Sequence, residues 1–293
     1  MTPEKIGPEK TGAQKIAFQG QHGAYSDLAC RTAYPGLVTL PCPTFEAAIE
    51  AVREGRAELA MLPTENSLAG RVPDMHALLP DSGLSIIGEF FLRVEHCLIG
   101  TVNATEEIIG HVHSHAVALG QVRGLIRELG AMPVVEADTA GSVEIVARLN
   151  DPAHAAIASA LAAELHGLKI LRRNVEDAAH NTTRFYVMAK TPRLQPREAP
   201  NLVTTFIFKV RNVPAALYKA LGGFATNGVN MTKLESYMVD GRFTATQFLA
   251  EVDGHPEDKA LRLAFEELNF FSQETKILGV YPAAPFRLEQ KRD

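Results

Sequence analysis

A proline-rich break is the feature that most constrains how this 293-residue chain can fold. Residues 191–200 read TPRLQPREAP and hold three prolines, which remove backbone donors and disfavour helices and interior strands. The hydrophobic pattern differs on the two sides of this segment. A chain of this length buries a sizeable core and divides into two or three compact units. The break therefore predicts a linker over 192–200 between two separately folded parts.

Before this break, short apolar runs alternate with stretches that have helical spacing. The run Lys15–Gly20 has strand composition, and Ser26 is placed to cap the helix that follows a glycine-containing loop. Residues Leu59–Leu62 are apolar at every position, as in a strand that is buried on both faces. Such alternation predicts parallel sheets covered by helices, which bind ligands at the carboxyl ends of their strands. Polar loops follow two of these strands, at Gln21–Tyr25 and Pro63–Ser67.

After the break, the elements follow a different order. Four segments have strand composition, and two helical segments start at Pro214 and Pro256. Asp240-Gly241 is a strong hairpin signal between the second and third strands. The expected strands are 202–210, 229–239, 242–252 and 275–281. The order β-α-β-β-α-β predicts a small ferredoxin-like domain over 201–282, followed by a tail over 283–293.

Composition argues against several classes of function. The net charge is −5 and the charges are mixed along the chain, so no basic stripe is available for nucleic acid. No apolar run approaches the ~20 residues of a membrane span. Residues 1–14 have the composition of a disordered lead rather than a signal peptide. The three cysteines lack a Cys-x-x-Cys pair, which indicates neither a disulfide framework nor a zinc site and predicts a cytoplasmic protein.

Two further patterns suggest ligands but have simpler explanations. His111, His113 and His115 alternate, which in a strand places three imidazoles on one face, as in a metal site. No carboxylate or thiolate accompanies them locally, so we interpret them as strand-end histidines on a polar surface and predict no metal. Gly20 and Gly23 lack the third glycine of a dinucleotide loop. We interpret them as a turn before a helix, whose first N–H groups can hold a carboxylate.

Two segments carry more polar groups than a turn requires. Thr64-Glu65-Asn66-Ser67 follows an apolar strand, and a capped turn accounts only for Asn66 and Ser67. In His180–Phe185, polar groups continue up to the start of a strand that has buried composition. Arg184 has two interpretations here. It forms a salt bridge, or it presents a guanidinium fork to a substrate carboxylate with threonine hydroxyls beside it.

These segments resemble the signature segments of prephenate dehydratase. The matching residues are Thr64–Ser67, Ser114 with Gln121 seven residues later, and Asn181–Phe185. The β-α-β-β-α-β part resembles the ACT domain that usually follows this enzyme. The resemblance implies two α/β lobes, similar to periplasmic binding proteins, that close on a substrate between them. Lobe one would comprise 15–91 and 172–190, and lobe two 92–171, within a catalytic domain over 15–191.

The resemblance implies a hydro-lyase that removes water and carbon dioxide from prephenate. The product is phenylpyruvate, and the reaction is the committed step toward phenylalanine. Prephenate carries two carboxylates and a ring hydroxyl, so the site needs cationic or N–H donors for the acids and a proton donor for the hydroxyl. Aromatisation and decarboxylation supply the driving force, so the enzyme mainly orients the substrate and assists the leaving group. No cofactor is expected.

The resemblance also assigns roles to single residues of this chain. Thr183 assists the departing hydroxyl, by proton transfer or by a strong hydrogen bond. Arg184 anchors a carboxylate, and Glu65 assists protonation or steers hydrogen bonding and lobe closure. The other catalytic candidates are Asn66, Ser114 and Gln121, and the substrate contacts are Ser26, Thr64, Thr182 and Phe185.

The ACT-like part departs from the family at its two expected binding segments. Family members usually carry Gly-Ala-Leu and Glu-Ser-Arg-Pro, where this chain has Pro214–Leu217 and Glu235–Met238. The residues expected to bind an effector are Ala215, Ala216, Leu217, Asn230, Glu235 and Ser236. The resemblance implies phenylalanine bound between the ACT domains of two subunits, in a homodimer or a dimer of dimers. A purely structural dimerisation domain is the alternative.

Two other functions stay open from the sequence. An arogenate dehydratase performs the same chemistry on the transaminated substrate. A non-catalytic amino-acid sensor also combines a two-lobed cleft with an ACT domain. The joint presence of the catalytic candidates favours an enzyme, because a sensor needs no hydroxyl beside a leaving group.

Overall fold

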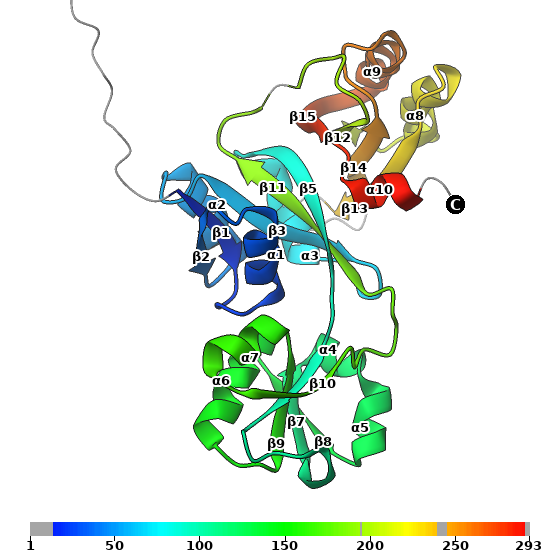
Figure 1. Cartoon of the computed structure of the whole chain (residues 1–293). Coiled ribbons are helices and arrows are strands. Elements are labelled where there is room, and N and C mark those ends of the chain that lie inside the picture. The colour runs from blue at the N-terminus through cyan, green and yellow to red at the C-terminus, as the bar shows by residue number, and fades with distance from the viewer. Residues whose placement is uncertain (1–13, 194, 239–244, 291–293) are drawn as a thin grey trace, which may run out of the picture.

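Two α/β lobes and a C-terminal domain beside the first lobe make up the fold (Figure 1). The computed structural model describes residues 14–193, 195–238 and 245–290. The strands in these ranges form three sheets, one in each part. No helix in the same ranges is long and apolar enough to cross a membrane. All three cysteines, Cys30, Cys42 and Cys97, are buried and free.

Lobe one contains the first sheet, with strand order β2-β1-β3-β11-β5 and β4 paired to β3. Its strands are β1 (Lys15–Gln19), β2 (Val38–Cys42), β3 (Leu59–Asn66), β4 (Gly70–Arg71), β5 (Ser85–Arg93) and β11 (Thr182–Ala189). Its helices are α1 (Tyr25–Ala33), α2 (Phe45–Arg53), α3 (Pro73–Leu78) and the short 3-10 helix Leu79–Asp81. The cap of α1 is Ala24 rather than the predicted Ser26, which lies in the first turn. The Asp27 carboxylate accepts from Gly23 N, and the helix starts two residues earlier than a cap at Ser26 would place it.

Lobe two contains the second sheet, with strand order β10-β6-β9-β7-β8. Its strands are β6 (Cys97–Gly100), β7 (His111–His115), β8 (Met132–Glu136), β9 (His154–Ala158) and β10 (Lys169–Arg173). Its helices are α4 (Ala116–Gly120), α5 (Arg123–Leu129), α6 (Thr139–Leu149), α7 (Ala160–His166) and the 3-10 helix Glu106–Ile108. Asp138 and Ser159 cap α6 and α7 with their side chains, and Gly130 ends α5 in the left-handed conformation.

Both of these sheets are mixed, although the alternation of strands and helices predicts parallel sheets. β1 is parallel to β2 and β3, and β7 is parallel to β8 and β9. β11 is antiparallel to β3 and β5, and β6 is antiparallel to β9 and β10. The cause is that the chain crosses between the lobes twice, after β5 and after β10. β10 ends at Arg173, so Arg172, predicted in the return to lobe one, lies in lobe two.

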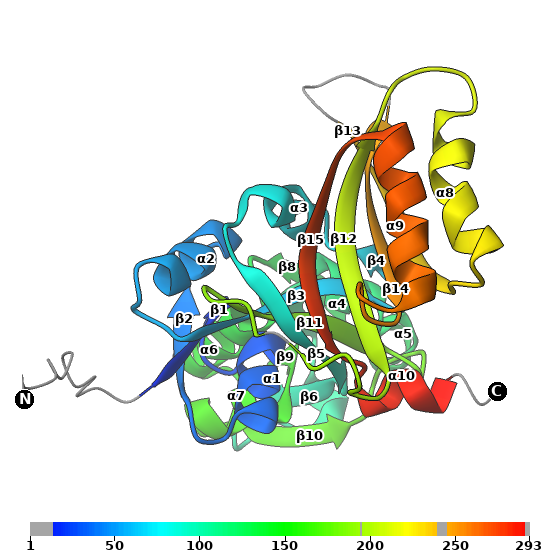
Figure 2. The ribbon, with the colours of Figure 1, turned by 90° about the horizontal axis from the view of Figure 1, so that it is seen from above.

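The C-terminal domain has the element order β-α-β-β-α-β that its hydrophobic pattern predicts. Its elements are β12 (Leu202–Val210), α8 (Ala216–Thr226), β13 (Met231–Met238), β14 (Ala245–Asp253), α9 (Lys259–Phe271) and β15 (Ser272–Pro282), followed by α10 (Pro285–Gln290). The strands are ordered β13-β14-β12-β15, and α8 and α9 lie along one face of this sheet (Figure 2). The expected hairpin turn at Asp240-Gly241 lies outside the described residues.

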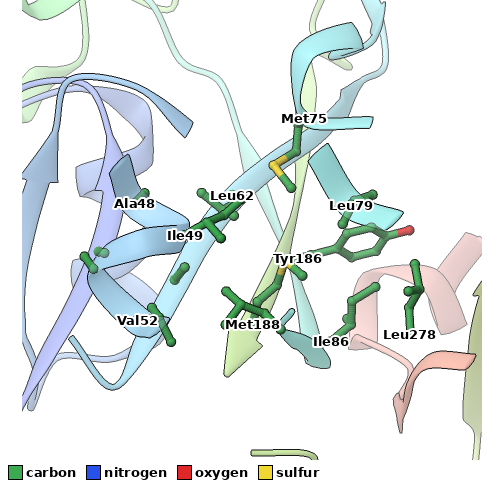
Figure 3. Close-up of a cluster of buried hydrophobic side chains, with 14 of the residues drawn as sticks. Ala48, Ile49, Val52, Leu62, Met75, Leu79, Ile86, Tyr186, Met188 and Leu278 are labelled. Carbon is green, nitrogen blue, oxygen red and sulfur yellow. The ribbon is translucent and has the colours of Figure 1, made fainter. Parts of the chain in front are cut away.

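The opposite face of the C-terminal sheet packs on lobe one. Leu278 of β15 lies in one buried cluster with Ile86 and Tyr186 of lobe one, as Figure 3 shows. Gly279 makes this approach possible, because a Cβ atom added there would lie 2.1 Å from the Ile86 carbonyl oxygen. The cluster continues without a break into the core between α2 and β3. The C-terminal domain therefore shares its hydrophobic core with lobe one.

Both helices of the C-terminal domain start later than their prolines predict. α8 starts at Ala216 rather than at Pro214, and α9 starts at Lys259 rather than at Pro256. Ala215 precedes α8 in the left-handed conformation, with φ of 61°. This is the segment in which the resembling family usually carries a glycine. A residue with a Cβ atom is strained in that conformation.

We expect Ala215→Gly to raise the free energy of unfolding by about 0.5–1 kcal/mol, because glycine relieves the left-handed strain and only part of the gain is lost to unfolded-state entropy. Ala215 is exposed, so no packing is lost. Urea unfolding measures the change. Ala225→Gly, at an exposed helical position of α8, is the control and should lower stability. Equal losses in both variants would contradict the expectation.

Candidate active site

The candidate site lies at the ends of β3 and β11, which pair antiparallel in lobe one. Thr183 lies opposite Asn66, and Arg184 lies opposite Glu65. Neighbouring side chains of a strand point to opposite faces of the sheet. Thr183 and Asn66 therefore contact each other on one face, and Arg184 and Glu65 on the other. These four residues belong to two motifs, and the two pairs lie in different environments on opposite faces of the sheet.

Asn66 has a fixed orientation because backbone groups determine which of its amide atoms is the acceptor. Its Oδ1 accepts from Leu68 N and Ala69 N, both at 2.9 Å. Its Nδ2 is therefore a donor, to Thr183 Oγ1 at 3.0 Å and to Asn181 Oδ1 at 2.8 Å. The Thr183 oxygen consequently accepts a hydrogen bond, and its hydroxyl hydrogen points elsewhere.

A chain of hydrogen bonds continues from Asn181 to the beginning of α1. Asn181 Nδ2 donates to Gln121 Oε1 at 2.9 Å, and His96 Nε2 lies 2.9 Å from the same oxygen. Because that oxygen is an acceptor, His96 carries its proton on Nε2, and its Nδ1 accepts from the Tyr25 hydroxyl at 2.7 Å. Burial lowers the pKa of His96 below its ordinary value, which keeps this neutral form at neutral pH.

This series of hydrogen bonds joins both lobes, and it leaves two hydrogen-bond donors without a protein acceptor among the described residues. Gln121 comes from lobe two, Asn66 and Thr183 come from lobe one, and His96 and Asn181 lie on the two crossings between the lobes. Among the described residues, no protein group accepts from the Thr183 hydroxyl or from Gln121 Nε2. Two oriented donors are therefore available to a small polar ligand between the lobes.

The loop before α1 holds the lobes close together. Ser159 Oγ, at the start of α7, donates to Gly23 O at 2.6 Å. Gly23 has φ of 88°, and a Cβ atom added there would lie 2.9 Å from Ala162 Cα. The interpretation of Gly20 and Gly23 as a turn before a helix agrees with their positive φ angles. The second glycine has an additional role, which is close contact between the lobes.

Arg184 is buried and surrounded by carboxylates, so the structure corresponds to the salt-bridge interpretation. Its side chain is 4% exposed. Nε donates to Glu89 at 2.8 Å, Nη1 to Glu65 at 2.8 Å and Nη2 to Glu251 of the C-terminal domain at 2.7 Å. Nη2 also lies 3.3 Å from the Tyr281 hydroxyl. The guanidinium group that was expected to anchor a substrate carboxylate is engaged by protein groups.

Glu65 and Glu251 are both held in the ionised form. Burial alone raises the pKa of Glu65, but Lys233 and Arg184 together lower it below the ordinary value. Burial also raises the pKa of Glu251, and the opposing charges of Arg184 and Arg287 bring it far below the ordinary range. An ionised Glu65 cannot donate a proton. The interpretation of Glu65 as a residue that steers hydrogen bonding fits this state better.

Five other predicted residues are buried or bond to protein groups. Ser114 is buried and donates to Ile157 O at 2.7 Å, so its hydroxyl supports the adjacent strand. Thr64 is buried and donates to Arg184 O at 3.2 Å. Thr182 N donates to the Ser67 hydroxyl at 2.9 Å. Phe185 packs in the core beneath α1, and Ser26 lies buried in the first turn of that helix.

The predicted effector residues lie in, or directly before, α8 and β13 of the C-terminal domain. Glu235 Oε2 lies 3.5 Å from Arg71 Nη1 of lobe one, and the same guanidinium donates to Ser236 O at 3.2 Å. Asn230 donates to Asp253 at 2.9 Å. Ala215 precedes α8, where Ala216 and Leu217 are half-buried against the helical core. β13 thus places two of the six residues against lobe one.

Sequence reasoning missed four residues that complete these networks. Asn181 lies in the motif Asn181–Phe185, and Tyr25 lies in the polar loop Gln21–Tyr25. Both segments have a signal in the sequence that could have identified these residues. His96 had no local signal. Arg287 lies in the predicted tail over 283–293, where the structure has α10, and it pairs with Glu89 at 2.8 Å. α10 also lines a cavity of about 700 Å³ beside Thr182 and Arg184.

The alternating histidines form a small cluster inside lobe two. His113 is 5% exposed, so the expected polar-surface environment is not what this residue has. It lies 2.9 Å from Glu136 and 2.8 Å from His154. His111 stacks on His154, and His115 caps α4 by accepting from Val117 N. Within the described ranges, no group of three or more His, Cys, Asp and Glu side chains has an arrangement that could hold a metal ion.

The two lobes and the hydrogen-bonded chain between them define a two-lobed α/β protein with a polar site at the crossings. Residues 16–193 match the family model described as prephenate dehydratase. The chain therefore belongs to the prephenate dehydratase family.

Relatives of this chain carry related descriptions. The bifunctional N-acyl-homoserine lactone acylase/prephenate dehydratase of Komagataeibacter europaeus is 62% identical over 276 residues, which cover 94% of this chain and 98% of that protein. Arogenate dehydratase 3, chloroplastic, of Arabidopsis thaliana is 36% identical over 284 residues, which cover 92% of this chain and 67% of that protein.

Solved structures share the fold over most of the chain. A structure described as GqqA, a novel type of quorum quenching acylases, has a TM-score of 0.88 at 62% identity and covers 94% of this chain and 100% of its own. The prephenate dehydratase of Arthrobacter aurescens in complex with L-Phe has a TM-score of 0.83 at 28% identity, and the match covers 92% of this chain and 90% of that one.

Proposed function

We propose that this chain converts prephenate to phenylpyruvate by loss of water and carbon dioxide. The observation that carries the proposal is the Thr183 hydroxyl, whose oxygen accepts from Asn66 at 3.0 Å. Its hydrogen is therefore available to a ligand between the lobes. Membership of the prephenate dehydratase family supports the same reaction.

The chemistry needs a donor at the leaving oxygen. The bond from the ring to its carboxylate breaks, the released electron pair aromatises the ring, and the hydroxyl leaves from the opposite ring carbon. Thr183 either gives its proton to that oxygen, which departs as water while solvent reprotonates Thr183, or donates a hydrogen bond to it while solvent supplies the proton. The donor is already oriented, so little reorganisation is needed during the reaction.

Gln121 supplies the second donor, from lobe two. Its Oε1 accepts from both Asn181 and His96, so its Nε2 is directed away from these two residues. An amide N–H group is suited to a carboxylate oxygen of the substrate. Donors from both lobes then fix the substrate in one orientation, which is the main requirement of a reaction with its own driving force.

We expect Thr183→Ala to lower kcat by roughly 10²–10⁴ with little change in KM, because the lost group acts on the leaving oxygen rather than on substrate binding. The assay follows phenylpyruvate by its absorbance in alkali after incubation with prephenate. Thr32→Ala is the matched control, since the exposed Thr32 hydroxyl bonds only to Leu28 O of its own helix, at 2.8 Å.

Three results decide the proposal. A folded Thr183→Ala protein that turns over prephenate near the wild-type rate would remove Thr183 from the mechanism. Turnover of arogenate and not of prephenate would change the substrate, as the names of the plant relatives suggest. Product from neither substrate would leave a non-catalytic amino-acid sensor as the better description.

We also propose that the C-terminal domain is an ACT domain that binds phenylalanine. Its element order and the A. aurescens prephenate dehydratase described in complex with L-Phe support this assignment. Glu235 and Ser236 lie on β13, which contacts lobe one through Arg71. A ligand at these residues is therefore close to groups of the catalytic part.

Phenylalanine should lower the rate of phenylpyruvate formation in a titration of the wild-type protein. The physical reason is that an effector which prefers a less active state shifts the population toward it. The initial rate at fixed prephenate measures the effect. A rate that stays flat across the titration would favour a structural dimerisation domain.

A second activity, hydrolysis of N-acyl-homoserine lactones, is favoured by the relative at 62% identity, whose name includes it. We expect the purified protein to release the free homoserine lactone from such a substrate, measured by chromatography. Thr183→Ala tested in parallel shows whether the two activities share a site. No release at protein concentrations that turn over prephenate would exclude this activity.

A further inference from the structure

Alternate residues of β13 contact lobe one. Lys233 Nζ lies 2.5 Å from Glu65 Oε2, Glu235 pairs with Arg71, and the Tyr237 hydroxyl lies 3.3 Å from His76 Nδ1. His76 Nε2 in turn lies 3.1 Å from the Thr64 carbonyl oxygen. This edge strand of the C-terminal domain therefore fixes the end of β3 directly before Asn66.

Glu251 of β14 fixes β11 in the same way that β13 fixes the end of β3. Its side chain is 1% exposed, and its carboxylate accepts from Arg184 at 2.7 Å and from the Tyr186 hydroxyl at 2.5 Å. Arg287 of α10 donates to the other carboxylate oxygen at 2.9 Å. Arg184 and Tyr186 are two residues apart, so one carboxylate holds two successive side chains on the same face of β11.

The charges of this network balance. The carboxylates are Glu65, Glu89 and Glu251, and the cations are Arg184, Lys233 and Arg287. A buried ion pair that loses one partner leaves an uncompensated charge, and the remaining groups must move to find another partner or water. The C-terminal part supplies Lys233, Glu251 and Arg287. The arrangement of Glu65 and Arg184 thus depends on residues outside lobe one.

Each residue that the C-terminal domain holds by an ion pair, Glu65 or Arg184, is the neighbour of a site residue on the same strand. Arg184 follows Thr183, and Glu65 precedes Asn66. The paired strands that place Asn66 Nδ2 3.0 Å from Thr183 Oγ1 also carry the charged side chains of Glu65 and Arg184 on their opposite face. A shift of β3 or β11 toward or away from the C-terminal domain therefore changes the site geometry directly.

We propose that Lys233 and Glu251 are positioning residues for the reaction, which act on Asn66 and Thr183 through Glu65 and Arg184. The inference rests on the proposed dehydration. Lys233 fixes β3 and Glu251 fixes β11, each from the face opposite the site. The catalytic geometry is consequently built partly by the C-terminal domain, without contact between that domain and the substrate.

The first test removes the charge of Lys233. Lys233→Met should lower kcat about tenfold with a much smaller change in KM, because small misplacements of reacting groups reduce rate more than binding. Lys233→Arg keeps the charge and should restore most of the rate. Arg262→Met is the control, since it removes the same charge from an exposed pair with Glu266 in α9. Its kcat should stay within about twofold of wild type.

The second test uses Glu251→Gln, which keeps the size of the side chain and removes its charge. Its kcat should fall at least as far as that of Lys233→Met. Hydrogen exchange of the backbone amides in β3 and β11 provides a readout that does not depend on activity. Exchange near Thr183 and Asn66 should become faster in both variants and stay unchanged in Arg262→Met.

The wild-type rate and the variant ratios report on different claims. No turnover by the wild-type protein contradicts the proposed function, whatever the variants do. Wild-type turnover together with folded Lys233→Met and Glu251→Gln proteins that keep the wild-type kcat overturns the positioning role. A rise in KM alone, with unchanged kcat, overturns it as well.

Discussion

The antiparallel pairing of β3 with β11 is the constraint on which the rest of the structure depends. It places Asn66 beside Thr183 on one face and Glu65 beside Arg184 on the other. A slip of one residue in a strand would exchange the two faces. The first face meets lobe two through Asn181 and Gln121, and the second meets the C-terminal domain through Glu251. The polar site and the domain interface are therefore specified by the same register.

Charge balance explains why the C-terminal domain and lobe one depend on each other for stability. Breaking a buried ion pair by removing one partner costs about 3–5 kcal/mol, because the other charge is left without compensation. Arg184 would be left with fewer carboxylate partners if Glu251 were absent, and without Arg184 the cation that pairs with Glu251 in the described part of the chain would be Arg287. The shared apolar cluster around Tyr186 and Leu278 adds to this dependence.

Local patterns in the sequence predicted local features well. The strands that start at Lys15 and Leu59 and the element order of the C-terminal domain follow from such signals. The motifs also identified Asn66 and Thr183, which the structure brings into contact. The direction of β11 and the partners of Arg184 depend on contacts across 67 to 119 positions, which no local pattern contains. Strand alternation alone, however, predicts that Thr183 and Arg184 lie on opposite faces of the sheet.

A crystal structure of the Thr183→Ala protein with prephenate tests the central claim most directly, because the slow variant retains its substrate. The account predicts prephenate between the lobes, with its ring hydroxyl beside Cβ of residue 183 and a carboxylate bonded to Gln121 Nε2. Arg184 would keep its pairs with Glu65, Glu89 and Glu251. A prephenate carboxylate bound to Arg184, with Glu251 displaced, would contradict the account.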